Sequence, residues 1–391
     1  MPGKDQNPWQ TDELRALRDT VTRFTKDQIL PYQDQWEQDG ELPRELSKKA
    51  GALGLMGAGY PEEVGGGGGG LRASVTVTEA LLEAGAAGGV PASMITTGIN
   101  VPHLIAAGDP WQIDRWVRPA LDGDIIGSLA ITEPGGGSDV GGLRTTARRD
   151  GDEYVVNGAK TFITSGTRAD FVVTAVRTGG PELPRARGVS LLVIEKGMPG
   201  FTVSKKLQKM GWHCSDTAEL SFEDVRVPVR HLVGEENTGF AQIGAHFVSE
   251  RIWLAAQAYS HAQRCLDLTV QWCRDRVTFG EPLISRLSVQ DTLAEMARKI
   301  DLARTYTHAV VDQAESGDTT DLIPRVCFAK NTATEYGEWV ADRAVQLFGG
   351  MGYLTEGEVE RQYRDMRILG IGGGTVEILR QLAARNLGLT A

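Results

Sequence analysis

The sequence predicts a multidomain α+β protein in which a helical domain, a β domain and a second helical domain follow one another. Up to residue 125, apolar residues recur every three or four positions, the period of helices with one buried face. Residues 126–238 instead contain short β-rich runs separated by Asp-Gly, Asn-Gly, Gly-Gly and Pro-Gly turns. From Gly239 onward the helical period returns. We therefore expect three domains, at 1–125, 126–238 and 239–391.

Composition and charge limit the class of protein. The 391 residues, 41% hydrophobic and 24% charged, are enough for two or three globular domains. A formal net charge of −10 argues against nucleic acid as the main partner. No apolar stretch approaches the roughly 20 residues that span a bilayer, so we expect no membrane span. Residues 1–20 are polar and predict neither a signal peptide nor a transit peptide.

The cysteines and histidines predict neither a disulfide framework nor a metal site. The cysteines form no CxxC pair, which favours reduced thiols in a cytoplasmic protein. They are Cys214, Cys265, Cys273 and Cys327. Histidine is sparse and shows no metal-ligand spacing, so we interpret His213 and His246 as polar packing residues.

The N-terminal domain is predicted to contain at least four helices. The first runs from Thr11 to about Asp39, and Pro31 is expected to kink or split it. A second helix covers 45–53, and two helices rich in small side chains cover 73–107. The six glycines at 65–70 follow no strand and precede no Lys, so we expect a flexible surface loop and no phosphate-binding loop.

The middle domain is predicted to be all β, and the C-terminal domain all helical. The expected strands are 154–156, 171–176, 189–194, 201–203 and 218–222. The expected helices lie near 239–276, 288–316, 321–348, 356–365 and 375–387.

A glycine-rich stretch at 130–142 is a candidate ligand-binding loop. The apolar run 125–131 predicts a strand, which Pro134 and three glycines then end. Such a loop can direct backbone N–H groups and the hydroxyls of Thr132 and Ser138 at a polar ligand. Taken alone, the stretch also fits an ordinary turn. It opens no helix, as a G-x-G-x-x-G motif would, and it lacks the Lys of a P-loop.

Two ordered motifs carry a family resemblance. The stretch Ala130-Ile-Thr-Glu-Pro-Gly-Gly-Gly-Ser-Asp-Val-Gly-Gly142 resembles the first signature of the acyl-CoA dehydrogenase flavoprotein family. Gln346-x-x-Gly349-Gly350-x-Gly352-Tyr353, followed by Glu356, Arg361 and Asp365, resembles the second. The resemblance extends from about Glu13 to Leu387. It implies a β-barrel-like middle domain, a C-terminal four-helix bundle, and an N-terminal region near 73–107 that walls off an acyl tail.

The resemblance also implies FAD as cofactor. The residues that match the family's isoalloxazine-binding positions are Thr132, Ser138, Phe162 and Thr164, with Phe162 where many members have Trp. The residues that match the diphosphate and adenine side are Arg276, Thr278 and Phe279. Gln346, Gly349 and Gly350 match positions that reach the flavin of a neighbouring subunit, and Thr375 joins the cofactor set. Read singly, Arg276 could be a solvated charge at a helix end and the glycines could merely end a helix.

The family reaction needs a carboxylate base, and its usual position is empty here. Many members place a Glu where this chain has Gly373, which cannot accept a proton. An apolar stripe at 240–266 is interrupted by Glu250, whose burial would raise its pKa towards that of a general base. The alternative is a buried Glu paired with Arg. Because Glu250-Arg251 resembles the base position of isovaleryl-CoA and long-chain acyl-CoA dehydrogenases, we assign Glu250 as the base.

The remaining site residues follow from the resemblance alone. It implies that the Gly373 N–H, with a flavin ribityl hydroxyl, binds the thioester carbonyl. The residues that match positions near the CoA moiety are Ser138, Ser215, Arg251 and Arg385.

We therefore expect FAD-dependent dehydrogenation of an acyl-CoA to the trans-2-enoyl-CoA. Glu250 would remove the α-proton, the hydride would pass to flavin N5, and the electrons would pass to an electron-transferring flavoprotein. The expected assembly is a homotetramer, a dimer of dimers formed through the C-terminal helices. Two alternatives stay open at this point: a flavin oxidase or monooxygenase on the same fold, and a non-catalytic acyl-CoA-binding relative. The sequence does not define the acyl chain length, its branching or the pathway.

Overall fold

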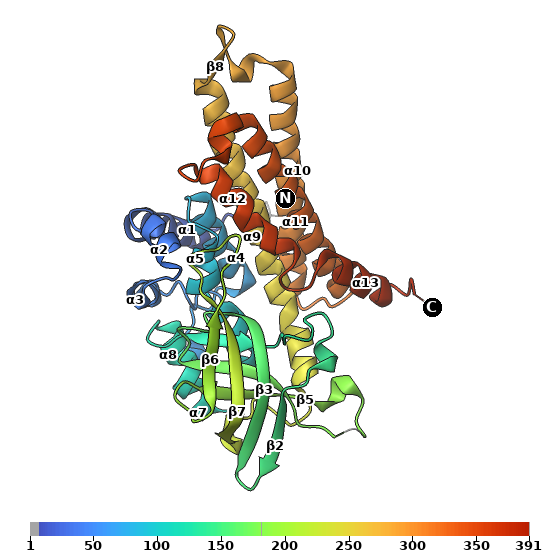
Figure 1. The fold of residues 1–391 in the computed structure, drawn as a ribbon. Coiled ribbons are helices and arrows are strands. Elements are labelled where there is room, and N and C mark those ends of the chain that lie inside the picture. Colours follow the sequence, from blue (N-terminus) through green and yellow to red (C-terminus); the bar gives the residue numbers. More distant parts are fainter. Residues whose placement is uncertain (1–7, 181, 391) are drawn as a thin grey trace.

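Three regions of different secondary structure follow one another along the chain (Figure 1). The structure is a computed structural model that describes residues 8–180 and 182–390. Helices precede residue 122, a β half-barrel follows, and helices return with α9 at Gly239. The predicted fold class is confirmed. The first strand begins at Gly127, so both changes of structure lie next to the domain boundaries that we propose.

The N-terminal region begins with a capped helix. Its helices are α1 (Asp12–Phe24), α2 (Gln33–Asp39), α3 (Arg44–Ala52), α4 (Gly70–Glu83), α5 (Gly89–Met94), α6 (Thr97–Ala107), α7 (Pro110–Gln112) and α8 (Arg118–Leu121). The Thr11 hydroxyl accepts the Leu14 N–H at 3.2 Å, which fixes the start of α1 where the sequence placed it. After a π-helical turn at Thr25–Ile29 the helix breaks before α2, so the split expected at Pro31 is confirmed.

Two expectations for this region are wrong. The segment expected to form two helices forms three, α4 to α6, because Gly85 adopts φ 107° after α4 and the chain turns again after α5. The glycines at 65–70 lie near the surface, but their backbone is fixed. Gly67 N donates to Gly57 O at 2.9 Å, and Gly69 N donates to Ala58 O at 3.0 Å. A side chain on Gly66 would also collide with the backbone of Tyr60.

The middle region forms one seven-stranded sheet. Its strands are β1 (Gly127–Ala130), β2 (Thr146–Asp150), β3 (Glu153–Thr164), β4 (Phe171–Arg177), β5 (Val189–Glu195), β6 (Phe201–Lys206) and β7 (Thr217–Pro228). The strand order is β1-β4-β2-β3-β7-β6, with β5 also paired to β4. The sequence had indicated all of these strands except β2. Side chains alternate along β4, so that Val172 and Val173 enter separate apolar clusters on opposite faces of the sheet.

The C-terminal region is built on three long helices that lie side by side in Figure 1. The elements are α9 (Gly239–Asp275), the short hairpin β8 (Val277–Thr278) and β9 (Glu281–Pro282), α10 (Leu287–Glu315), α11 (Leu322–Phe348), α12 (Glu358–Met366) and α13 (Val376–Asn386). All five predicted helices are confirmed within a few residues, whereas the hairpin was not expected. α4 packs against α9, while α12 and α13 pack against α11. The loop before α13 is thereby brought next to the first half of α9.

Two further findings concern chemistry outside the site. The four cysteines are all buried and carry free thiols. Within the described part of the chain, no helix is both long enough and apolar enough to cross a membrane.

Candidate functional site

Glu250 lies on the inner face of α9 and is half-buried. It forms no hydrogen bond or ion pair with any residue that the structure describes. Burial raises the pKa of its carboxyl group to about 7, and the nearby charges of Arg251 and Lys330 oppose that rise. An unpartnered carboxylate with a pKa near neutrality is suited to accept a proton at physiological pH.

Arg251 does not pair with Glu250, although the two residues are adjacent in sequence. Its side chain is buried, and its Nε donates to the carbonyl oxygen of Gly373 at 3.1 Å. Its guanidinium also lies 5.1 Å from the ring centre of Phe247. The alternative in which Glu250 is a buried Glu paired with an Arg is therefore wrong, since no described Arg forms an ion pair with it.

The loop before α13 brings Gly373 next to Glu250. Glu250 Oε1 lies 3.5 Å from the position that a Cβ on Gly373 would occupy. Gly373 has φ 64° and Gly374 has φ 101°, backbone conformations that glycine adopts without strain. The next residue, Thr375, caps α13, because its hydroxyl accepts the Ile378 N–H at 3.3 Å. The structure thus gives Thr375 a structural role beside the cofactor role that we predict.

A second group of predicted residues lies at the end of β3 and on the glycine-rich loop. Phe162 exposes 68% of its surface and has φ 60°, an uncommon backbone conformation for a residue with a side chain. Thr161 N donates to Thr132 O at 2.9 Å and joins the loop to β3. The side-chain hydroxyls of Thr132, Ser138 and Thr164 form no hydrogen bond with another described residue.

These features fit a flavin. An exposed aromatic face is suited to stack on a planar ring, and uncommitted hydroxyls can donate to the ring's polar atoms. The chain therefore has residues able to hold an isoalloxazine ring on the side of the β domain. Among them, Phe162 offers a smaller ring than the Trp that the family resemblance leads one to expect at this position.

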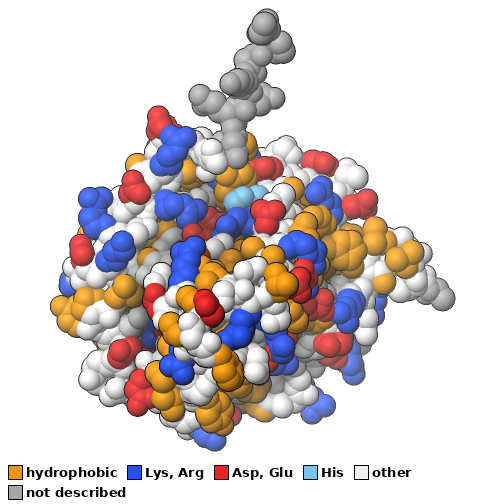
Figure 2. Space-filling model, turned by 90° about the horizontal axis from the view of Figure 1, so that it is seen from above, with side chains coloured by type: hydrophobic (Ala, Val, Ile, Leu, Met, Phe, Trp, Pro, Cys, Tyr) orange, Lys and Arg blue, Asp and Glu red, His pale blue; other side chains and the backbone are white. Residues whose placement is uncertain are grey.

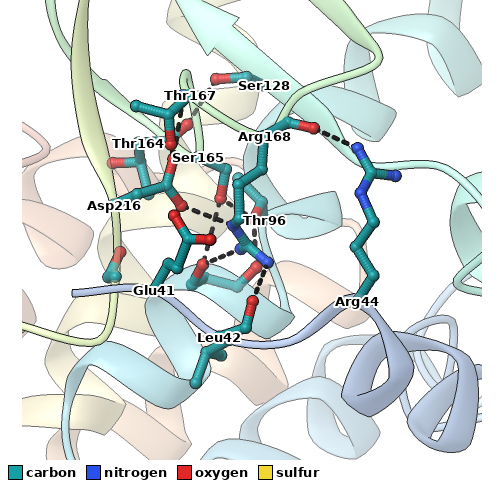
Figure 3. A network of polar contacts seen from close by, with 12 residues as sticks. Glu41, Leu42, Arg44, Thr96, Ser128, Thr164, Ser165, Thr167, Arg168 and Asp216 are labelled. Atoms are coloured by element: carbon teal, nitrogen blue, oxygen red, sulfur yellow. Dashed lines mark hydrogen bonds and ion pairs between the residues drawn. The ribbon is translucent and has the colours of Figure 1, made fainter. Parts of the chain in front are cut away.

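A buried ion pair supports the turn that follows β3 (Figure 3). Arg168 Nε lies 2.7 Å from Asp216 Oδ1, and the two side chains are 7% and 0% exposed. The Asp216 carboxylate also accepts the backbone N–H and the hydroxyl of Thr167, at 3.0 and 2.5 Å. The Asp216 carbonyl accepts Ser165 N at 2.9 Å. Ser165 has φ 59°, so these bonds hold a second residue with a strained backbone three positions after Phe162, the residue suited to stack on a flavin.

The same arginine connects this turn to the N-terminal domain. Arg168 Nη1 donates to Leu42 O at 2.7 Å, and Nη2 donates to the hydroxyl of Ser93. The hydroxyls of Ser165 and Thr96 lie 3.0 Å apart. Sequence reasoning missed this network, because its members come from four separate segments. The one available signal was a lone Arg among small residues in the turn.

Another buried ion pair anchors the glycine-rich loop, and sequence reasoning missed it too. Lys160 Nζ lies 2.9 Å from Glu133 Oε1 and also donates to Ile131 O at 2.9 Å. Glu133 accepts the backbone N–H groups of Arg144 and Thr145, at 2.6 and 2.8 Å. These contacts fix both ends of the loop that carries Thr132 and Ser138. A charged residue directly before Pro134 was the signal in the sequence.

The remaining predicted cofactor residues lie at the far end of the helical domain. They are Arg276, Thr278, Phe279, Gln346, Gly349 and Gly350. Glu250 lies in the first half of α9, and Arg276 directly follows its last residue. Because an α-helix rises about 1.5 Å per residue, the two residues are tens of ångströms apart. Trp272 Nε1 donates to Leu347 O at 3.1 Å, so the ends of α9 and α11 meet. Within one chain, this end therefore cannot share a flavin ring with Glu250.

The other residues that the sequence singled out differ in burial and in their contacts. Ser215 is buried, and its hydroxyl has no partner among the described residues; this burial argues against direct contact with CoA. Arg385 is exposed on α13. His246 packs edge-on against His103 with ring centres 4.7 Å apart, and a His213 ring nitrogen lies 3.0 Å from Lys209 O. Both histidines thus have packing or polar contacts within the protein.

No cation site is evident in the parts of the chain that can be described. There, no group of three or more His, Cys, Asp or Glu side chains is arranged to hold a metal ion.

Comparison with protein families matches three models that follow one another along the chain. Residues 11–124 match the acyl-CoA dehydrogenase N-terminal domain, 128–225 the acyl-CoA dehydrogenase middle domain, and 237–388 the acyl-CoA dehydrogenase C-terminal domain.

Individual relatives give the same result. The long-chain specific acyl-CoA dehydrogenase of Rattus norvegicus is 37% identical over 377 residues, covering 96% of this chain and 87% of the relative. A crystal structure of a putative acyl-CoA dehydrogenase from Mycobacterium smegmatis is 64% identical, with a TM-score of 0.97 over 98% of this chain and 100% of the other. Butyryl-CoA dehydrogenase from Megasphaera elsdenii is 31% identical, with a TM-score of 0.91 over 98% and 100%.

Proposed function

Because the chain belongs to the acyl-CoA dehydrogenase family and is an oxidoreductase of that class, we propose that Glu250 is the base that removes the α-proton of the acyl-CoA. The product would be the trans-2-enoyl-CoA. One observation above all supports the proposal: an unpartnered carboxylate with a pKa of about 7 occupies the space in front of Gly373. The family resemblance implies that Gly373 stands where many members have their catalytic Glu.

The loop supplies a second element of the proposed mechanism. As the α-proton leaves, negative charge develops on the thioester oxygen, and a fixed N–H donor lowers the energy of that state. Gly373 can offer its backbone N–H for this purpose without a side chain. Arg251 holds the Gly373 carbonyl, which lies in the next peptide plane, and so anchors the chain directly after the donor. Its proposed contact with the CoA moiety would have to use the nitrogens that this bond leaves free.

We propose FAD as the cofactor, with Phe162, Thr132, Ser138 and Thr164 as the residues that hold its ring. When bound, FAD supplies an acceptor for the β-hydride of the substrate. The chain's own contribution would be to hold that ring through Phe162 and the neighbouring hydroxyls and to present the Glu250 carboxylate to the substrate from α9. We further propose that an electron-transferring flavoprotein reoxidises the enzyme, and that the base position on α9 makes the chain similar to the isovaleryl-CoA and long-chain branches.

We propose a homotetramer with each FAD at a subunit interface. The support is that Arg276 and Gln346 lie far from Glu250, so an FAD bound by these residues would have to place its ring beside the Glu250 of another subunit. The surface also offers apolar side chains for contact: Phe279, Leu287 and Tyr353 are 97%, 81% and 86% exposed. Figure 2, which views the molecule from above, shows apolar side chains at the surface among charges of both signs. A flavin-loaded monomer in solution would contradict this assembly.

The test of the catalytic proposal is Glu250→Gln in the FAD-loaded enzyme. The amide keeps the shape of the side chain and removes the proton acceptor, so flavin reduction by acyl-CoA under anaerobic conditions should slow by about 10²–10⁴-fold. FAD content and acyl-CoA binding should persist. Glu83→Gln is the matched control, because burial also raises the pKa of Glu83 but its carboxylate pairs with Arg304, away from Glu250 and Gly373. Near wild-type turnover of Glu250→Gln would show that another group is the base.

The same assay with a panel of acyl-CoAs would define the substrate. The bleaching rate should depend on chain length and branching, and the substrate with the highest kcat/KM identifies the acyl group that the pocket accepts.

A further inference from the structure

Lys330 is a fully buried lysine next to the loop that carries Gly373. It extends from α11, and its Nζ donates to the carbonyl oxygen of Gly374 at 2.9 Å. It forms no ion pair with a carboxylate in the described part of the chain. Burying an ammonium group without a carboxylate partner costs free energy. Its position therefore suggests a role that depends on the positive charge.

Two cations act on consecutive carbonyl groups of this loop. Arg251, from α9, binds the Gly373 carbonyl, and Lys330, from α11, binds the Gly374 carbonyl. Peptide groups are planar, so fixing these two carbonyls fixes the two peptide planes that directly follow Gly373. Both glycines have a positive φ, and their carbonyls accept hydrogen bonds from α9 and α11. The chain around the proposed N–H donor is thus held from two sides.

Lys330 also belongs to the electrostatic surroundings of Glu250. The charged groups that act on the Glu250 carboxylate are Arg251, on its own helix, and Lys330, on α11. Both lower the pKa of Glu250, against the larger effect of burial. His246, one turn earlier on α9, has its pKa lowered by burial and is neutral at physiological pH.

The ammonium group keeps its charge near neutral pH. Burial, together with the positive charge of Arg251, lowers the pKa of Lys330 to about 8, while Glu250 and Glu338 act to raise it. Cys327, also on α11, contributes no competing charge, because burial raises the pKa of its thiol. Lys330 is therefore mostly protonated at pH 7.

We propose that Lys330 is a positioning residue for α-proton removal, which holds the Gly373–Gly374 turn against α11 and favours the ionised form of Glu250. The proposal rests on the proposed role of Glu250 as base. Proton transfer from the substrate neutralises Glu250, so the charge of Lys330 stabilises the state before transfer. Lys330 consequently lowers the pH above which the base is available, together with Arg251 and against the larger effect of burial.

Three substitutions separate charge from hydrogen bonding. Lys330→Arg keeps the charge, Lys330→Gln removes the charge but keeps an N–H donor, and Lys330→Met removes both. The measurement is the rate of anaerobic flavin reduction by acyl-CoA as a function of pH in the holoenzyme. In the Gln and Met variants the midpoint of the acid limb should rise by on the order of one pH unit, which lowers the rate at pH 6 roughly tenfold. In Lys330→Arg the midpoint should stay near that of the wild type.

Asn331→Ala is the matched control. Asn331 Nδ2 donates to Val376 O at 3.1 Å, so this change loosens the same loop without altering a charge. Its rate should fall by a similar factor at every pH, with an unchanged midpoint. Infrared difference titration of the Glu250 carboxyl, identified by its loss in Glu250→Gln, gives the midpoint even for variants with low activity.

The outcomes distinguish the two proposals. If the Gln and Met variants keep the wild-type midpoint by both methods, the role assigned to Lys330 is wrong. If Glu250→Gln keeps wild-type turnover, the assignment of the base fails instead, whatever the Lys330 variants do.

Discussion

The carboxylate of Glu250, on α9, lies next to the backbone of Gly373, in the loop before α13. Glu250 Oε1 lies 3.5 Å from the position that a Cβ on Gly373 would occupy, although the two residues belong to separate parts of the C-terminal domain. A carboxylate can therefore reach this space from α9 or, in principle, from the loop before α13. Because Glu250 has no partner among the described residues, its presence there lowers stability when it is ionised.

The first prediction concerns stability. Burial raises the folded-state pKa of Glu250 to about 7, whereas an unfolded Glu titrates at about 4.3. Between these values the folded state holds a proton that the unfolded state has released, so stability falls as pH rises through this window. Glu250→Gln should therefore be more stable than the wild type at pH 8, by roughly 1–3 kcal/mol once partial exposure is allowed for. At pH 4.5 the two proteins should be nearly equal.

Chemical denaturation at the two pH values measures this difference. Exposed Glu63 is the control position, where Gln should change stability little at either pH. A Glu250→Gln protein that is less stable than the wild type at pH 8 would mean that the ionised carboxylate is better solvated than its burial indicates.

The second prediction concerns the buried ion pair of Arg168 and Asp216, which supports the turn after β3. Arg168→Met leaves the buried Asp216 carboxylate without its cation, a change that typically costs about 3–5 kcal/mol. Because Asp216 also holds Ser165 and Thr167, FAD should bind more weakly as well. Denaturation curves and fluorescence titration of the apoprotein with FAD measure the two effects.

Arg226→Met is the matched control for this experiment. Arg226 pairs with Glu153 and Asp150 on the exposed face of the sheet, so its loss should change stability and FAD affinity little. If Arg168→Met resembles Arg226→Met in both assays, the buried pair does not support the turn.

The sequence predicted those site residues that interrupt a local pattern, but not the contacts that they make with distant segments. Glu250 was found because a charge interrupted an apolar stripe and a glycine stood where a base was expected. The same pattern left open an ion pair with an Arg, but Glu250 has no such partner among the described residues, and the neighbouring Arg251 binds the Gly373 carbonyl. Lys330 gave no signal, because a lysine in a helix is normally solvated and only the packing of α11 buries it. Contacts between distant segments, and not local patterns, decide these cases.

In the fold, too, local patterns were predictable and the effects of tertiary packing were not. Helix and strand periods predicted the order of the elements, and Thr11 predicted the start of α1. The positive φ of Phe162 was not predictable, because it results from the register shift between β3 and β7 at Lys160–Ile163. Ser215 was matched to the substrate site by the family resemblance, which gives no information on burial, and its side chain is buried in the fold.

The third prediction concerns assembly. Phe279 is 97% exposed on the hairpin that follows α9. If this end contacts another subunit, Phe279→Ser should shift the protein towards smaller species and lower its FAD content, while the secondary structure stays intact. Light scattering after size-exclusion chromatography measures the mass. Leu53→Ser, at a 51% exposed position after α3, should change neither property. An unchanged mass and FAD content for Phe279→Ser would place the interface elsewhere.

The last prediction moves the base from α9 to the loop. If both positions reach the same α-carbon, Glu250→Gly should abolish turnover, and adding Gly373→Glu should restore part of it. The structure identifies two costs. Gly373 has φ 64°, where a Glu is strained by roughly 1–2 kcal/mol. A Cβ on Gly373 would also lie only 2.4 Å from Cδ1 of Leu254, which must move aside. We therefore expect weak recovery in the double variant, with a preference for shorter and straighter acyl chains.

Adding Leu254→Val to the double variant should increase the recovery, because it removes the colliding methyl group and keeps an apolar side chain in place. Anaerobic flavin reduction is compared among Glu250→Gly, the double variant and the triple variant, all at equal FAD content. Leu254→Val in the wild-type background is the control, and it should cost a little stability without altering the base. If the triple variant is no faster than Glu250→Gly, a carboxylate at position 373 cannot reach the α-carbon. The proximity of Glu250 to Gly373 would then reflect packing alone.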